Sequence, residues 1–494
     1  MDPKIPVRTR ATNKEGLRLS AAFTSHIPGS RLVPSTPRDA LGECSPRSTS
    51  GIVESRASLR PAVAVWILVI LAQAQFRKRS VTELAQGTAF DSQVIFQIVV
   101  WAFLGLVAIY LIRSRRVNWQ LLRYGPLKWY CGFMFVALGS SFYSPAPALS
   151  AFRVLQHLVA LILVASMGVN LKRIHVFATM FVGATAILVI LGALGLTFGL
   201  SWITPPSQSW LWTAEPEWRF ASAFGHPTQI ATLAAIAIFT ADDARRRLYR
   251  VAVGGFNLAA LGLTASRTAL AGAFIGFAVV MAAKRRLTLF VCLCGALATG
   301  VMLSPAWSGL LTNYLSRTQT SDQLTSLNGR LVLYQDASKK IQEHWLLGEG
   351  FLANRVDVLD EQADGSGTTH AHNVMLEALT STGVIGGLFV LAASLHICIL
   401  PFEMLRRYKG RPALRREAIL LAASLPPVIG GCILDAGFAT TLNTIGWAFM
   451  VLAARGQMAL NACEIAQKSG LRNRALHKRE IASLLCWNAK VRTR

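Results

Sequence analysis

Two histidines and an asparagine precede an apolar stretch in TTHAHNVMLEALTSTGVIGG, residues 368–387. An imidazole has a near-neutral pKa, so His370 or His372 can take a proton from a hydroxyl group. The two residues lack the HExxH spacing that places two zinc ligands on one helix face, so we expect a general base rather than a metal site. We expect Asn373 to position the histidine ring or, in the simpler interpretation, to cap the following helix.

Three arginines form a second group of candidates. Synthesis outside the membrane needs a donor activated beforehand, such as a lipid-linked diphosphate, and a diphosphate leaving group needs positive charge nearby. Arg219 lies in EWRFASAFGHP and Arg267 lies in TASRTAL, between two apolar runs. Arg330 follows the turn dipeptide Asn328–Gly329. Simpler roles remain open, namely an aromatic interface loop for Arg219, lipid headgroup contact for Arg267 and a solvated surface for Arg330. A functional role is favoured for Arg267, since ionisable groups at a membrane edge are costly.

The composition predicts a polytopic helical membrane protein. Of the 494 residues, 53% are hydrophobic and 15% are charged, whereas a soluble domain carries about 25% charged residues. The net charge of +25 does not indicate a nucleic-acid groove, because Lys and Arg gather in short clusters between apolar runs. The eight cysteines include no CxxC pair, so we expect buried thiols rather than a metal or disulfide framework.

The apolar runs define one membrane domain, residues 61–455, between two basic tails. Residues 1–60 are rich in Ser, Pro, Thr and Arg, which predicts a disordered cytoplasmic tail, and residues 456–494 form a second basic cytoplasmic tail. About twelve runs have the length and hydropathy of membrane spans. They cover residues 61–76, 94–112, 129–143, 148–169, 176–200, 228–241, 251–265, 268–283, 287–303, 373–400, 418–438 and 441–454.

Basic clusters near the span ends predict the orientation, because Lys and Arg there stay on the cytoplasmic side. Clusters such as RSRR at 113–116 recur after every second span and place both termini inside, with RKR at 77–79 as the exception. Two long segments, 201–227 and 304–372, are then extracytoplasmic. The second contains, within 329–351, a predicted amphipathic helix on the membrane surface. Its helical spacing is carried by Leu331, Tyr334, Ser338 and Ile341.

Together these elements resemble the O-antigen ligase and O-antigen polymerase superfamily, which includes the exopolysaccharide-production polymerases. The similarity covers residues 60–455. It is carried by the spans, the long loop before the last three spans, NGRxxxY…HWLLGEGF at 328–351 and HAHNVMLEALTSTGVIGG at 370–387. The resemblance implies an all-helical, C-type glycosyltransferase fold. It also implies that His372 is the base that deprotonates the acceptor hydroxyl, with His370 as an auxiliary residue.

The resemblance further implies that Arg219 and Arg267 bind a diphosphate and that Arg330 is an additional arginine of the site. The expected donor is a polyprenyl-diphosphate-linked glycan, transferred with inversion to a sugar hydroxyl without a metal or other cofactor. The expected product is an exopolysaccharide or O-antigen built on the periplasmic side of a bacterial inner membrane. A flippase and a chain-length regulator are expected partners, and nucleic acid is not.

Other functions remain open from the sequence. A ligase of the same superfamily would transfer the glycan to lipid A core, and nothing in the chain distinguishes the two acceptors. A sugar or anion transporter would use the intramembrane carboxylates Glu377 and Asp435, which can equally be structural partners of arginines. No internal repeat of the kind common in transporters is visible, which favours the glycosyltransferase. A non-catalytic scaffold would make the Arg and His positions coincidental.

Overall fold

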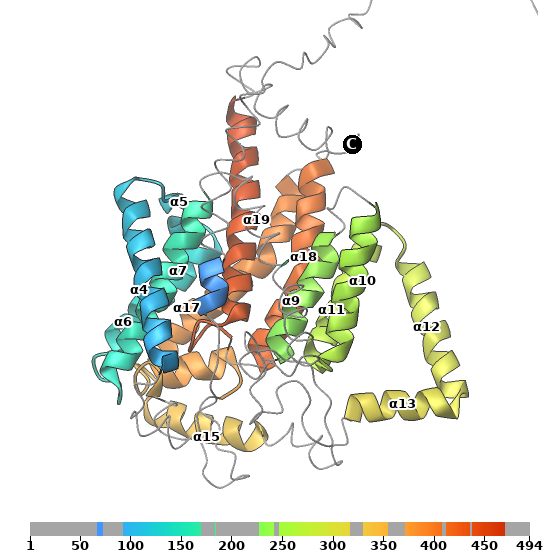
Figure 1. Ribbon diagram of the computed structural model, residues 1–494, viewed down its shortest axis with the longest axis horizontal. Coiled ribbons are helices and arrows are strands. Elements are labelled where there is room, and N and C mark those ends of the chain that lie inside the picture. Colours follow the sequence, from blue (N-terminus) through green and yellow to red (C-terminus); the bar gives the residue numbers. More distant parts are fainter. Residues whose placement is uncertain are drawn as a thin grey trace, which may run out of the picture. The chain divides into compact units, whose positions relative to one another are not determined.

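The computed structural model describes residues 67–72, 92–168, 183, 227–241, 247–316, 330–353, 371–407, 412–434 and 437–469. The chain divides into two units, Met1–Ile52 and Val53–Arg494, and every described residue belongs to the second unit. Within the described ranges all regular elements are helices (Figure 1). The all-helical class is therefore confirmed. The predicted N-terminal tail, the run at 176–200 apart from residue 183, and loop residues 201–226 lie outside the described residues.

The helices follow the predicted apolar runs closely. They are α4 (Ser92–Arg113), α5 (Trp119–Arg123), α6 (Pro126–Ser140), α7 (Pro147–Met167), α9 (Pro227–Ala241), α10 (Arg247–Leu263), α11 (Arg267–Ala283), α12 (Leu287–Leu303), α13 (Pro305–Ser316), α15 (Arg330–Glu343), α17 (Val374–Arg407), α18 (Pro412–Leu434) and α19 (Thr444–Ser469). The last helix continues to Ser469, so the first part of the predicted C-terminal tail, residues 456–469, is helical.

Four described helices, α4, α7, α17 and α18, are long and apolar enough to cross a membrane. The pair α12 and α13 bends by 104° and counts as a fifth candidate if it is one broken span. Shorter apolar helices lie within α9, α10 and α11. These helices identify a multi-pass membrane protein, whereas the count of about twelve spans stays a prediction.

Prolines and tight turns determine where several helices begin. Pro126 and Pro147 stand in the first turn of α6 and α7, where the missing N–H is not needed for the helix. Between α10 and α11 only three residues intervene, and Ala265 turns the chain with a φ of 46°. This short turn places Arg267 at the start of α11, between the two apolar runs noted in the sequence.

The largest core cluster lies where α6, α7, α17, α18 and α19 meet. Its large side chains are fully buried and include Tyr130, Phe133, Phe438, Trp447 and Phe449. A second contact, between α11 and α18, depends on small residues, because a Cβ at Gly272 would lie 2.5 Å from the Cα of Pro427. Close backbone approach of this kind is how helices associate where lipid removes the hydrophobic driving force.

The helix α17 is broken at Gly383, which differs from the single predicted span at 373–400. Gly383 has a φ of 63° and a ψ of −165°, a conformation outside the helical region. An unbroken helix of 34 residues would be about 51 Å long, well beyond the roughly 30 Å hydrocarbon core. The break leaves a short helix, residues 374–382, before a segment of spanning length, residues 384–407.

The helix predicted within 329–351 is present as α15, but its buried face differs from the predicted apolar face. Leu333 and Ala337 are buried against Ala371 at the start of α17, with Leu376 beside them. Leu331 and Ser338 are exposed, and Leu331 remains available to a membrane surface. The helix therefore packs on protein along one side.

Candidate active site

His372 occupies a strained turn directly before α17. Its φ of 48° lies in the left-handed region, which a residue with a Cβ adopts only when its surroundings impose it. Asn373 caps the helix, because its Oδ1 accepts the N–H groups of Met375 at 2.9 Å and Leu376 at 3.2 Å. The capping role that the sequence favoured for Asn373 is confirmed.

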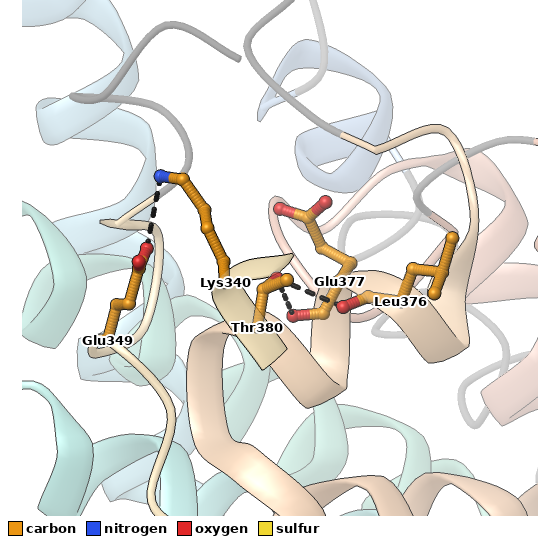
Figure 2. Close-up of polar contacts among 5 residues, drawn as sticks. All are labelled: Lys340, Glu349, Leu376, Glu377 and Thr380. Atoms are coloured by element: carbon orange, nitrogen blue, oxygen red, sulfur yellow. Dashed lines mark hydrogen bonds and ion pairs between the residues drawn. The ribbon is translucent and has the colours of Figure 1, made fainter. Parts of the chain in front are cut away.

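A buried carboxylate holds the other side of this turn. Glu377 is 0% exposed, and its Oε2 accepts the N–H of Ala371 at 2.8 Å. Figure 2 shows the Glu377 carboxyl group pointing away from the Thr380 side chain, whose hydroxyl donates to the carbonyl oxygens of Leu376 and Glu377. The backbone around His372 is thus tied to α17 through both Asn373 and Glu377.

The electrostatic surroundings of His372 favour the neutral ring. Burial, and to a lesser degree the positive charge of Arg330, lower the pKa of His372 from its ordinary 6.5 to about 4. At neutral pH the imidazole is therefore unprotonated. A neutral ring beside a cation is suited to accepting a proton while the cation holds an anion.

Arg330 reaches this site because α15 packs on the start of α17. It is the first residue of α15, and Leu333 and Ala337 of the same helix contact Ala371. The structure therefore brings Arg330 together with His372 and Asn373, which follow it by more than 40 residues in the sequence.

Arg267 lies at the same end of the helix bundle. It is the first residue of α11, after Ser266. The last turn of α18 lies near Arg267, because a Cβ at Gly430 would lie 2.9 Å from Thr268. Gly437, just after α18, lies near His372, because a Cβ there would lie 3.4 Å from Val374. Arg219 and His370, the other two predicted site residues, lie outside the described residues, as does Asp435.

The segment HWLLGEGF, residues 344–351, fills the break in α17 with main-chain hydrogen bonds. The N–H groups of Glu349 and Gly350 donate to the carbonyl oxygens of Thr380 and Ser381, which end the short first helix. In return the N–H of Val384 donates to the carbonyl oxygen of Trp345. The short helix that carries His372 is therefore fixed at both ends.

An ion pair connects α15 to this segment. Lys340 Nζ lies 3.2 Å from Glu349 Oε2, and both side chains are largely buried (Figure 2). Two serines fix Phe351, the last residue of the segment. Ser144 Oγ donates to the Phe351 carbonyl oxygen at 2.9 Å, and Ser140 Oγ accepts the Phe351 N–H at 3.1 Å. The GEGF segment is thus held between α15, α17 and the end of α6.

The sequence analysis missed a polar network inside the bundle. His157 of α7 is fully buried, and its Nε2 lies 3.1 Å from the carbonyl oxygen of Thr440. Because a carbonyl oxygen only accepts, Nε2 carries the proton in the neutral ring, and Nδ1 accepts from the Tyr130 hydroxyl at 2.5 Å. The spacing of Ser150, Arg153 and His157 along one face of a predicted span was the available signal.

The described residues contain no group of three His, Cys, Asp or Glu side chains that could hold a metal ion. Their arrangement instead defines a multi-pass helical membrane protein with a histidine and arginines gathered at one end. Residues 252–391 match the family model described as O-antigen ligase, a segment that contains Arg267, Arg330, His370, His372 and Asn373 but not Arg219. The match confirms the resemblance to the O-antigen ligase and polymerase superfamily. The comparison with curated proteins finds no match.

Proposed function

We propose that the protein transfers a glycan from a polyprenyl-diphosphate-linked donor to a sugar hydroxyl, and that it polymerises exopolysaccharide or O-antigen repeat units. The observation that carries the proposal is the pairing of a neutral His372 with Arg330 on a rigid turn, inside a segment that matches the O-antigen ligase family. A coarser statement, a membrane protein of glycan-transfer type, follows from the family match and the apolar helices.

In the proposed reaction His372 takes the proton of the acceptor hydroxyl as its oxygen attacks the anomeric carbon of the donor. The new glycosidic C–O bond forms while the bond between the anomeric carbon and the diphosphate oxygen breaks. The electron pair leaves with the polyprenyl diphosphate, whose growing negative charge Arg267, Arg219 and Arg330 stabilise in place of a metal. Attack opposite the leaving group inverts the anomeric configuration.

The low pKa of His372 fits this sequence of events once the donor is bound. A base with a pKa of about 4 is weak, but a diphosphate beside Arg330 would offset the charge that contributes to the shift. The pKa of His372 should then rise in the complex by the part of the shift that Arg330 causes, which makes the ring a stronger base when its substrate is present.

The acceptor class has a second candidate. The matched family is described as O-antigen ligase, which favours transfer to lipid A core as the alternative to polymerisation. In either case we place the reaction on the periplasmic side of a bacterial inner membrane, with a flippase and a chain-length regulator as partners. A sugar or anion transporter is the alternative of another class, and the interrupted helix α17 is the observation in its favour.

The experiment uses the purified full chain in liposomes with a polyprenyl-diphosphate-linked oligosaccharide. A ladder of longer lipid-linked glycans is expected for the wild type but not for His372→Ala. His344→Ala is the control and should also give the ladder, because His344 is exposed and lies within the same matched range, residues 252–391. Arg267→Gln should fail where Arg286→Gln, at the opposite end of α11, succeeds.

Two other outcomes would overturn the polymerase. Donor consumption only after addition of lipid A core would identify a ligase. Movement of the oligosaccharide or of an anion across the membrane without chemical change would identify a transporter.

A further inference from the structure

Glu377 is a buried carboxylate for which the proposed reaction has no direct use. It is 0% exposed and lies in the short first segment of α17, one turn after the helix begins. A carboxylate in such surroundings is unfavourable unless hydrogen bonds compensate for the lost water. Its Oε2 receives one such bond, from the backbone N–H of Ala371 at 2.8 Å.

This bond closes a loop around His372. Ala371, whose N–H is held, directly precedes His372, and Asn373, which caps the helix, directly follows it. The left-handed φ of His372 is therefore enclosed between two residues, Ala371 and Asn373, that are both bonded to the same short helix. A non-glycine residue keeps this conformation only where its surroundings over-determine it, and such positions cluster at functional sites.

We propose that Glu377 is a positioning residue that holds the imidazole of His372 towards the acceptor hydroxyl through the Ala371 peptide. The inference rests on the proposed function, because it concerns the geometry of that base. Glu377 accepts the main-chain N–H of Ala371, so it fixes the peptide that leads into His372. The carboxylate that the sequence offered to a transporter thus has a role in the transferase site.

Two substitutions separate the hydrogen bond from other properties of the side chain. Glu377→Gln keeps an oxygen acceptor of similar size at the same place, so kcat should stay within about fivefold of the wild type. Glu377→Leu keeps the bulk and removes the acceptor, so the ring loses its placement. Because a misplacement of about 1 Å can lower a rate by roughly 100-fold, kcat should fall by about that factor while KM changes little.

Thr382→Val is the matched control. Thr382 is also 0% exposed and lies in the same short helix, but its hydroxyl donates only to the carbonyl oxygen of Ala378, one turn earlier. Its loss removes a buried hydrogen bond of the helix without touching the turn at His372. Thermal stability should therefore fall to a similar degree in Thr382→Val and Glu377→Leu, whereas kcat falls only in the latter.

The pH profile supplies a readout that a merely structural role would not move. In Glu377→Leu the freed ring gains solvent, so the pKa of His372 should rise from about 4 towards 6.5, against the charge of Arg330. The acid limb of kcat/KM should move to higher pH by more than one unit, and it should stay in place in Thr382→Val.

Three results would overturn the proposal: wild-type kcat in Glu377→Leu, a Glu377→Gln enzyme that is folded yet as slow as Glu377→Leu, or an unchanged acid limb. If Glu377→Leu does not fold, the Glu377→Gln result alone carries the decision. Failure of the proposed function is distinct, because then neither the wild type nor any variant elongates the lipid-linked oligosaccharide.

Discussion

Replacement of Gly383 by alanine tests whether the break in α17 is required. The backbone there has a φ of 63° and a ψ of −165°, a region essentially restricted to glycine. A Cβ at this position would also collide with the carbonyl oxygen of Leu346. Alanine therefore meets two obstacles, its own backbone conformation and the docked segment 344–351.

The magnitude follows from the contacts at the break. The unfavourable backbone conformation costs about 1–3 kcal/mol. Displacement of segment 344–351 would also loosen the three hydrogen bonds from the N–H groups of Glu349, Gly350 and Val384, each contributing about 1 kcal/mol. The sum, about 4–6 kcal/mol, is comparable with the whole stability of many domains, and we expect the melting temperature to fall by about 10 °C.

The assay is thermal unfolding of the purified chain in lipid nanodiscs, followed by the elongation assay with the lipid-linked oligosaccharide. Gly105→Ala is the control, since Gly105 lies in α4 with open space around the position of its Cβ. That variant should keep the wild-type melting temperature or exceed it slightly, because alanine favours a helix by about 1 kcal/mol over glycine. A Gly383→Ala variant with wild-type stability and activity would refute the reasoning.

Four further predictions concern the same site. Asn373→Ala should lower the free energy of unfolding by about 1 kcal/mol because two N–H groups lose their cap, and Asn373→Ser should restore most of it, as measured by thermal unfolding. The acid limb of kcat/KM, which reports the free enzyme, should lie near pH 4. The acid limb of kcat, which reports the complex, should lie at higher pH, because the bound diphosphate offsets the charge of Arg330 and raises the pKa of His372. Acid limbs at the same pH would contradict this effect of the diphosphate. Because folding lowers this pKa from 6.5, the unfolded chain binds more protons between pH 6.5 and 4, so the wild type should lose stability relative to His372→Gln as the pH falls through that window. Lys340→Met should destabilise the protein by about 2 kcal/mol by leaving Glu349 largely buried without its cation, and Glu349→Gln in the same chain should recover part of the loss in a denaturation series.

The helices and their approximate ends could be predicted because hydropathy and proline positions are local properties. The apolar run at 287–303 and the helix α12 have the same limits, and Pro147 begins α7 one residue before the predicted run. The cap at Asn373 could also be predicted, since it depends on N–H groups only two and three residues later along the chain.

The break in α17 and the partner of Glu377 could not be predicted, because both depend on contacts formed elsewhere. TSTGVIGG contains three glycines, and only the docking of residues 344–351, more than 30 positions earlier, selects Gly383. The bond from Glu377 to Ala371 exists only once His372 adopts its left-handed conformation. The buried face of α15 was missed for a similar reason. It consists of Leu333 and Ala337 alone, and these two residues are buried because they pack against Ala371, more than 30 residues later in the chain.

The way segment 344–351 is bonded to the break in α17 affects how its sequence can vary. The three hydrogen bonds from the N–H groups of Glu349, Gly350 and Val384 join peptide groups alone, while the side chains of Trp345, Leu346 and Leu347 are exposed. Substitutions of these three side chains should therefore leave the hydrogen bonds to the short helix after His372 intact. The exposed side chains of the segment are thus a place where surface contacts can change while the turn at His372 keeps its geometry.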